Sequence, residues 1–308
     1  MTPIYFTAAD GTSIATYRWE TSAVTKANIF IIHGLAEHAL RYARTAQQLN
    51  AQGYNVYSCD LRGHGNSVKA REDLGYLADD DGWNKLVNDV IEILQKLKID
   101  KPNTPLILLG HSLGSFVAQQ IIYERPRLAD AAVFSGSNGK PPKMATAGRG
   151  IARAEKLRLG KRGKSQVINS MTFGKFNQSF PDAETPFDWL SRDPVEVKLY
   201  FNDSLCGFLC STQLWIDFLD GINEISKPSH KARIPKELPL YIFAGDKDPS
   251  CDNGRGATNL ANEYREAGLK NVTSKIYPDG RHEMLNETNR NEVISDLVNW
   301  LNKTVASD

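Results

Sequence analysis

The stretch of sequence that decides the fold is LILLGHSLG, at residues 106–114. Its first four residues are apolar, as in a short buried strand, and residues 116–123 after it have a helical pattern. A serine on a sharp turn from strand to helix projects at the carboxyl end of the strand, and the flanking glycines avoid clashes there. We therefore interpret Ser112 as a nucleophile on such a turn. A purely structural glycine-rich turn is the alternative.

Short apolar runs alternate with segments of helical periodicity on both sides of this stretch. The alternation is typical of strands joined by crossover helices in a mostly parallel sheet. We predict an α/β fold in which helices cover both faces of a central sheet. The predicted buried strands are residues 29–32, 56–59, 106–109, 131–134, 240–244 and 274–277, and an opening hairpin pairs residues 4–7 with 14–19.

One interval, residues 137–226, breaks this alternation, because no strand-like run occurs between residues 134 and 240. We predict that residues 137–226 form an inserted, mainly helical cap, and that residues 1–136 and 227–308 form the two parts of the core. Apolar and aromatic residues recur at helical spacing in 208–219. They are expected to form the interior of the cap and, in part, to line a pocket.

The first part of this interval carries the one charge patch that the sequence shows. Residues 140–164 contain nine lysines and arginines but a single acidic residue, Glu155. A solvated helix face is the interpretation that we favour. The alternative is a transient contact between the cap and an anionic lipid surface.

Composition argues against several other classes of protein. The 37 lysines and arginines nearly balance the 36 aspartates and glutamates, so the net charge of +1 gives no overall attraction to nucleic acid, and no such partner is expected. The four cysteines are too few for a disulfide framework and lack the paired spacing of a zinc site. No signal-peptide pattern or membrane-spanning apolar run is recognisable. We expect a soluble cytoplasmic protein with reduced thiols and no metal.

A serine hydroxyl needs a neighbouring base, normally a histidine that a carboxylate orients. In the chain order serine, acid, histidine, the base follows the last strand. His282 lies there, after the turn at residues 278–281 and before the final helix. We predict that His282 is the base, and an ordinary loop histidine is the alternative.

The carboxylate is expected after a strand between the serine and the histidine. Residues 135–138 contain none, whereas Asp246, Asp248 and Asp252 follow the strand at 240–244. Asp246 is close enough to the strand end to bond the turn, and Asp252 is placed to cap the next helix. We therefore choose Asp248 as the acid.

Acyl transfer through a serine also needs two N–H groups that bind the developing oxyanion. The main-chain N–H of Leu113, directly after Ser112, is one candidate. The other is the N–H of Leu35, in the loop that follows the strand at residues 29–32. Neither assignment depends on the leucine side chain.

Five motifs together resemble the α/β-hydrolase branch of monoacylglycerol lipases and lysophospholipases, of the serine aminopeptidase S33 type. They are HGLAEH at 33–38 followed by Arg41-Tyr42, DLRGHGNS at 60–67, GHSLG at 110–114, GDKD at 245–248 and GRHE at 280–283. The resemblance implies an α/β-hydrolase fold and a serine hydrolase that needs no cofactor, with a cap over an acyl-binding tunnel. It supports Asp248 as the acid, and Leu35 and Leu113 as the oxyanion donors.

Two of these motifs also have structural interpretations. Asp60 and Arg62 are expected to form an ion pair beneath the site rather than to take part in catalysis. Glu37, His38 and Arg41 are expected to start a helix, and contact with a polar head group is the alternative.

We predict hydrolysis of carboxylic esters, with monoacylglycerol or lysophospholipid as the substrate class and short-chain or aryl esters as a close alternative. Ser112 attacks the acyl carbonyl, His282 moves the protons, and Asp248 orients His282. The expected partner is a small-molecule or lipid ester, and the sequence does not indicate an oligomeric state.

Two other classes of function stay open. One is a non-catalytic protein of the same fold that only binds a ligand. The other is a proline-type aminopeptidase, which needs a carboxylate in the cap to bind the amino group of its substrate. The acidic residues available for that role are Glu155, Asp182, Glu184, Asp188, Asp193 and Glu196.

Overall fold

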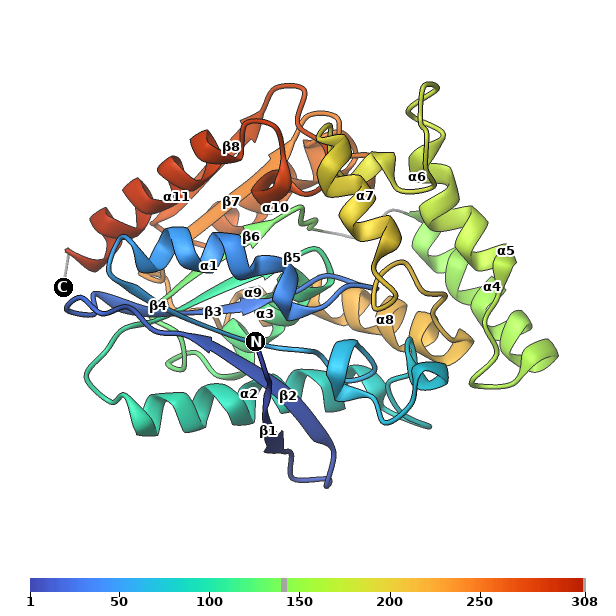
Figure 1. The fold of residues 1–308 in the computed structure, drawn as a ribbon, viewed down its shortest axis with the longest axis horizontal. Coiled ribbons are helices and arrows are strands. Elements are labelled where there is room, and N and C mark those ends of the chain that lie inside the picture. The colour runs from blue at the N-terminus through green and yellow to red at the C-terminus, as the bar shows by residue number, and fades with distance from the viewer. Residues whose placement is uncertain (140–142, 307–308) are drawn as a thin grey trace.

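A computed structural model describes residues 1–139 and 143–306 of the chain. Its central feature is an eight-stranded sheet with the order β1-β2-β4-β3-β5-β6-β7-β8 (Figure 1). β1 and β2 form the predicted antiparallel hairpin, β2 is antiparallel to β4, and the remaining strands are parallel. The strands are β1 (Ile4–Thr7), β2 (Ser13–Trp19), β3 (Ala27–Ile32), β4 (Tyr54–Cys59), β5 (Leu106–His111), β6 (Ala131–Ser135), β7 (Leu240–Gly245) and β8 (Val272–Tyr277).

Helices cover both faces of the sheet, which confirms the predicted α/β class. α1 and α11 pack on one face, and α2, α3 and α10 pack on the other (Figure 1). Neighbouring strand residues point to opposite faces, so Phe30 and Ile31 of β3 belong to different cores. The helices are α1 (Ala43–Asn50), α2 (Gly82–Asp100), α3 (Leu113–Glu124), α4 (Lys143–Leu159), α5 (Gln166–Asn169), α6 (Lys175–Asn177), α7 (Pro194–Asn202), α8 (Thr212–Ile225), α9 (Pro228–Lys231), α10 (Arg255–Glu266) and α11 (Arg290–Val305).

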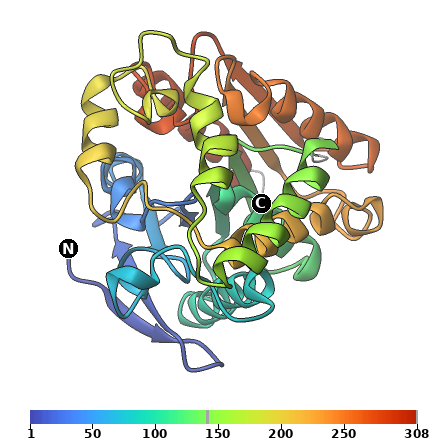
Figure 2. The same cartoon turned by 90° about the vertical axis from the view of Figure 1, so that its right-hand side faces the viewer.

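The described part of the chain between β6 and β7 contains helices and loops but no strand, apart from one isolated bridge between Lys164 and Ser211. We call residues 143–226 the inserted segment. Figure 2 views the molecule from the end at which α4, α5 and α6 lie. α8 packs against α4 and also against α2 and α3, and Trp215 of α8 belongs to the main core. The division into a cap at 137–226 and two core parts stays a prediction.

Three arginines of the basic stretch 140–164 form ion pairs. The pairs are Arg149–Asp220, Arg158–Glu155 and Arg162–Asp73. Arg162 also lies over the ring of Tyr76, at 4.0 Å from its centroid. Ion pairing reduces the charge that this surface presents to a distant anionic partner. Lys140 lies outside the described residues.

None of the described helices combines the length and the apolar character needed to cross a bilayer.

Candidate active site

Ser112 lies on the turn between β5 and α3. Its φ of +49° and ψ of −118° are backbone angles that a non-glycine residue rarely adopts. Two glycines allow the turn, because a Cβ at Gly114 would overlap the carbonyl of Ile32 and a Cβ at Gly110 would overlap the main chain of α3. The local sequence therefore fixes a strained, partly exposed serine at the carboxyl end of β5.

His282 and Asp248 form a buried hydrogen-bonded pair. The distance from His282 Nδ1 to Asp248 Oδ2 is 2.8 Å, and the residues are 3% and 0% exposed. Burial by itself would raise the pKa of Asp248, but His282 and the hydrogen bonds to the carboxylate outweigh it and lower the pKa to about 2. Burial would lower the pKa of His282, but the neighbouring Asp248 raises it above the ordinary value. Asp248 is thus ionised at neutral pH and stabilises an imidazolium.

Two further side chains hold the carboxylate of Asp248. Ser250 donates to Oδ1 from its N–H at 2.9 Å and from its Oγ at 2.7 Å, and the Cys251 thiol donates to Oδ2 at 3.1 Å. Ser250 Oγ also lies 2.9 Å from His282 Nδ1. The sequence analysis missed both residues. Their position just after Asp248, at the start of the turn that Asp248 caps, is the signal that was available.

Ser112 and His282 line one small cavity of about 30 Å³. In the described part of the chain no direct hydrogen bond joins Ser112 Oγ to His282. Catalytic hydrogen bonds are often long before substrate binds, so a shared cavity lining is the relevant geometry. The structure therefore places Ser112 and His282 in the lining of one cavity, and it joins His282 to Asp248 by a hydrogen bond.

The loop that carries Leu35 is braced from two sides. Glu37 Oε1 accepts a hydrogen bond from Gly34 N at 2.5 Å. The carbonyl of Ala36 accepts hydrogen bonds from Tyr200 Oη at 2.8 Å and from Gly207 N at 2.9 Å. Ala36 has a φ of +57°, so these contacts maintain an unusual backbone conformation next to Leu35. Leu35 and Leu113 both line the apolar cavity beside Ser112.

Two different cavities meet at Ser112. The larger, about 290 Å³, is mainly apolar, and we call it the apolar cavity. The smaller, of about 30 Å³, has two carboxylates among mostly apolar side chains in its lining, and we call it the polar cavity after these carboxylates. The polar cavity includes Glu37, Tyr200, His282 and Glu283. The apolar cavity includes Phe116, Gly148, Ile151, Phe173, Trp215, Phe218 and Leu219.

The inserted segment supplies much of the apolar cavity. Trp215, Phe218 and Leu219 of α8 lie in its wall, in agreement with the expectation that residues 208–219 line a pocket. A still larger cavity, of about 960 Å³, lies at the opposite ends of the strands, near Pro105 and Val272. It contains none of the candidate residues, and the catalytic ends of parallel strands are their carboxyl ends.

Glu37, Arg41 and Glu283 form a buried charged cluster in addition to the short helix Ala39–Tyr42, which begins here as expected. Arg41 donates to Glu37 Oε2 at 2.6 Å and to both oxygens of Glu283 at 2.6 and 2.7 Å. Burial would raise the pKa of each glutamate, but Arg41 outweighs it and lowers both, that of Glu283 to about 2. Arg41 therefore links the loop of Leu35 to the residue that follows His282.

The predicted ion pair between Asp60 and Arg62 is wrong. Arg62 instead contacts Asp89 of α2, through Nε at 2.8 Å and Nη2 at 2.6 Å, and Asp10. The oxygens of Asp60 accept hydrogen bonds from Ala39 N, Asn66 N and Tyr17 Oη. These three hydrogen bonds satisfy the Asp60 carboxylate. Arg62 pairs instead with the buried carboxylate of Asp89 in α2. Both residues keep the structural role that was expected.

Comparison with known proteins agrees with this architecture. Residues 23–289 match the family described as serine aminopeptidase, S33. The monoglyceride lipase of Mus musculus is 29% identical over 97% of this chain and 90% of its own length. The monoacylglycerol lipase of Mycolicibacterium smegmatis is 27% identical over 96% of this chain and 95% of its own length. The crystal structure of a thermostable carboxyl esterase from Bacillus coagulans has the same fold, with a TM-score of 0.89, 23% identity and 98% coverage of both chains.

Proposed function

The chain belongs to the family described as serine aminopeptidase, S33, and on that premise we propose that it hydrolyses monoacylglycerols through Ser112, His282 and Asp248. The coarser statement, a carboxylic ester hydrolase related to lipases and esterases, agrees with the relatives. One observation carries the finer proposal: a larger, mainly apolar cavity and a small cavity with two carboxylates in its lining meet at Ser112. An ester of a fatty acid with a small polar alcohol has the same two-sided chemistry.

In this mechanism Ser112 Oγ attacks the acyl carbonyl while His282 takes its proton. Asp248 stabilises the imidazolium that forms, which agrees with the raised pKa of His282. The N–H groups of Leu35 and Leu113 bind the oxyanion. His282 then protonates the departing alcohol, which leaves the acyl group on Ser112. In the second step His282 takes a proton from water, the water attacks the acyl group, and the fatty acid is released.

The apolar cavity supports an acyl chain as the buried part of the substrate. Its lining is aromatic and aliphatic, and each buried methylene contributes about 0.8 kcal/mol to binding. Binding energy along the chain therefore favours long acyl groups over the short-chain and aryl esters that the sequence left open.

The polar cavity supports glycerol over a phospholipid head group as the alcohol. Glu37 and Glu283 face it, and both carry negative charge at neutral pH because Arg41 lowers their pKa. Carboxylates accept hydrogen bonds from hydroxyl groups but repel a phosphate. We therefore place lysophospholipids behind monoacylglycerols.

The aminopeptidase alternative finds little support in the inserted segment. None of its six candidate acids lines the polar cavity or the apolar cavity. Three of them are engaged elsewhere, in the pairs Glu155–Arg158, Asp193–Arg290 and Glu196–Arg44. An amino-terminal ammonium group would have to contact Glu37 or Glu283, which Arg41 already neutralises in part.

A matched substrate panel tests this proposal. Initial rates are measured for monoacylglycerols from butanoyl to oleoyl, the corresponding lysophosphatidylcholines and nitrophenyl esters, and an aminoacyl anilide, with Ser112→Ala as the blank. We expect the highest kcat/KM for a long-chain monoacylglycerol. Faster hydrolysis of the lysophospholipids or of the anilide would replace the proposed substrate, and a folded protein that hydrolyses none of them would favour the ligand-binding alternative.

A further inference from the structure

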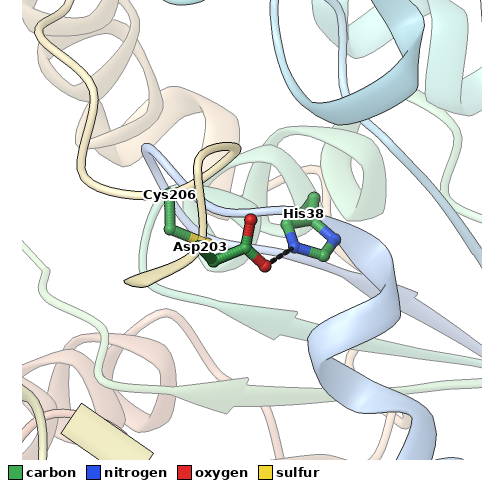
Figure 3. Close-up of side chains that lie close together, drawn as sticks. All are labelled: His38, Asp203 and Cys206. Atoms are coloured by element: carbon green, nitrogen blue, oxygen red, sulfur yellow. Dashed lines mark hydrogen bonds and ion pairs between the residues drawn. The ribbon is translucent and has the colours of Figure 1, made fainter. Parts of the chain in front are cut away.

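Three potential metal ligands converge outside the two cavities at Ser112. The imidazole of His38, the carboxylate of Asp203 and the thiol of Cys206 have ligand atoms within 4.8 Å of one another. His38 comes just before the short helix Ala39–Tyr42, and the other two come from the loop that follows α7. In Figure 3 the carboxylate lies between the imidazole and the cysteine side chain. No step of the proposed ester hydrolysis uses these three residues.

The three groups are the ligand types that a zinc-like dication prefers. Zinc binds thiolate, imidazole and carboxylate, and three protein ligands plus water make a four-coordinate site. Tetrahedral bonds of about 2.0–2.3 Å set neighbouring ligand atoms roughly 3.5 Å apart. His38 Nε2 and Asp203 Oδ2 already lie 2.8 Å apart, so small side-chain shifts suffice to complete the geometry.

The surrounding charge favours a cation at this place. Asp203, Glu37 and Glu283 act electrostatically on Cys206 as negative charges, and Arg41 acts on it as a positive charge. Carboxylates thus outnumber cations around the thiol, which favours a bound dication. In the described part of the chain no hydrogen bond to Cys206 Sγ is present, so a metal would displace no existing partner of the sulfur.

A cation has a route to these ligands. The Asp203 side chain is 34% exposed and Cys206 is partly exposed, whereas His38 is 6% exposed. Asp203 therefore meets an entering hydrated ion first, and the buried imidazole completes its coordination. A position that faces solvent remains for a water ligand, as in three-ligand zinc sites.

We propose that His38, Asp203 and Cys206 bind one zinc-type dication that links the loop after α7 to the loop of Leu35. On binding, the metal–sulfur bond replaces the S–H bond of Cys206, and that proton goes to solvent. His38 Nε2 binds the metal in place of the shared hydrogen bond with Asp203, and its proton is carried on Nδ1. Gly207 N and Tyr200 Oη bond the Ala36 carbonyl in the same region, so the metal would tighten an existing contact between the two loops.

Cobalt(II) is the probe that tests the site, because it substitutes for zinc and reports its ligands by absorption. The full-length protein, stripped with a chelator, is titrated with Co²⁺ and then with Zn²⁺. We expect one Co²⁺ per chain, a thiolate-to-cobalt charge-transfer band, the visible bands of a four-coordinate ion, and loss of all of them on addition of Zn²⁺. Zn²⁺ should also raise the Tm of the protein, since it binds only the folded site.

Three variants and two controls localise the metal. Cys206→Ser should abolish the charge-transfer band, and Asp203→Asn and His38→Gln should weaken binding at least about tenfold, the loss seen when even outer-sphere partners are removed. Cys210→Ser controls for a second nearby thiol. His230→Gln controls for a histidine–carboxylate pair without cysteine, since His230 contacts Glu224 at 2.8 Å. Both controls should bind Co²⁺ as the wild type does.

Three outcomes would overturn the proposal: no stoichiometric Co²⁺ binding, binding without a thiolate band, or binding that Cys206→Ser and Asp203→Asn leave unchanged. In each case the His38–Asp203 contact is a hydrogen bond without a metal role. The readouts are spectra and Tm, so their failure is independent of whether the protein hydrolyses esters.

Discussion

At the scale of single residues, charge-assisted contacts hold two neighbouring residues of the candidate site, His282 and Glu283. Asp248 holds His282, and Arg41 holds Glu283 next to it. Both contacts are buried, where an ionised group without its partner is costly. Removal of one partner from either contact should therefore have a large effect.

Asp248→Asn should lower kcat by about 10⁴-fold, the scale that this substitution has in serine triads. Asp248 raises the pKa of His282, and only neutral His282 acts as a base. The acid limb of the kcat/KM profile should therefore lie above the ordinary imidazole pKa of 6.5 in the wild type and move to lower pH in the variant. Initial rates across the pH range measure this, with Asp246→Asn as the control. A limb that does not move would remove Asp248 from its role.

Arg41→Met should lower the free energy of unfolding by about 3–5 kcal/mol, because Glu37 and Glu283 stay buried without their counter-charge. In the wild type the pKa of both glutamates is lowered, so their contribution is present above the ordinary pKa of 4.5 and is lost as pH falls. In the variant the buried carboxylates gain protons instead. The deficit should therefore begin to shrink as pH falls through the raised pKa of the variant's glutamates, above 4.5, and should vanish only below the lowered pKa of the wild-type pair.

Urea denaturation at neutral and acidic pH measures that deficit. The variant Arg41→Met with Glu37→Gln and Glu283→Gln is the matched control, because it has no unpaired charge to bury. It should regain much of the stability. A single Arg41→Met variant as stable as the wild type would show that the cluster is hydrated rather than buried.

At the scale of elements, α4 forms one wall of the apolar cavity. Gly148 lies in the cavity lining, and a Cβ there would meet only Leu219 Cδ1, at 3.7 Å. Gly150, two residues on, has nothing within 4 Å of such a Cβ. The two glycines therefore form a matched pair on one helix, one facing the cavity and one facing solvent.

Gly148→Leu should shorten the longest acyl chain that the protein accepts, while Gly150→Leu should leave the chain-length profile unchanged. Both changes improve helix propensity, so stability does not distinguish them. Each methylene excluded from the cavity costs about 0.8 kcal/mol, roughly fourfold in kcat/KM. The kcat/KM values for a series of monoacylglycerols measure the effect. Identical profiles for the two variants would mean that acyl chains bind elsewhere.

The strands and turns could be predicted where residues close together in the sequence specify them. The turn at Ser112 follows from glycines that neighbouring backbone requires, and the buried strands follow from short apolar runs. The last strand begins at Val272 rather than at residue 274, because β8 is an edge strand whose polar residues blur its start. Contacts between distant segments had no local signal: Glu283 is 242 residues from Arg41 in the chain.

The same limit explains why the sequence did not indicate the proposed metal ligands. Cysteine spacing indicates a zinc site only when the ligands are neighbours in sequence. His38 comes from the first third of the chain, and Asp203 and Cys206 come from the loop after α7. Tertiary structure alone brings them together.

At the scale of the whole molecule, the inserted segment contributes to the wall of the apolar cavity beside Ser112. Its basic stretch gives a further prediction. Charge reversal of Arg153, Arg158 and Arg162 should leave binding to anionic vesicles unchanged, because two of these arginines are already in ion pairs. Vesicle cosedimentation measures this, with neutral vesicles as the reference. A clear loss of binding would favour the membrane-contact alternative.

Active-site labelling with a fluorophosphonate, followed in parallel with monoacylglycerol hydrolysis, tests the central claim most directly. The account predicts one label per chain on Ser112, loss of hydrolysis in proportion to labelling, and neither label nor hydrolysis in folded Ser112→Ala. Hydrolysis that persists in Ser112→Ala, or a label on another residue that abolishes activity, would contradict it.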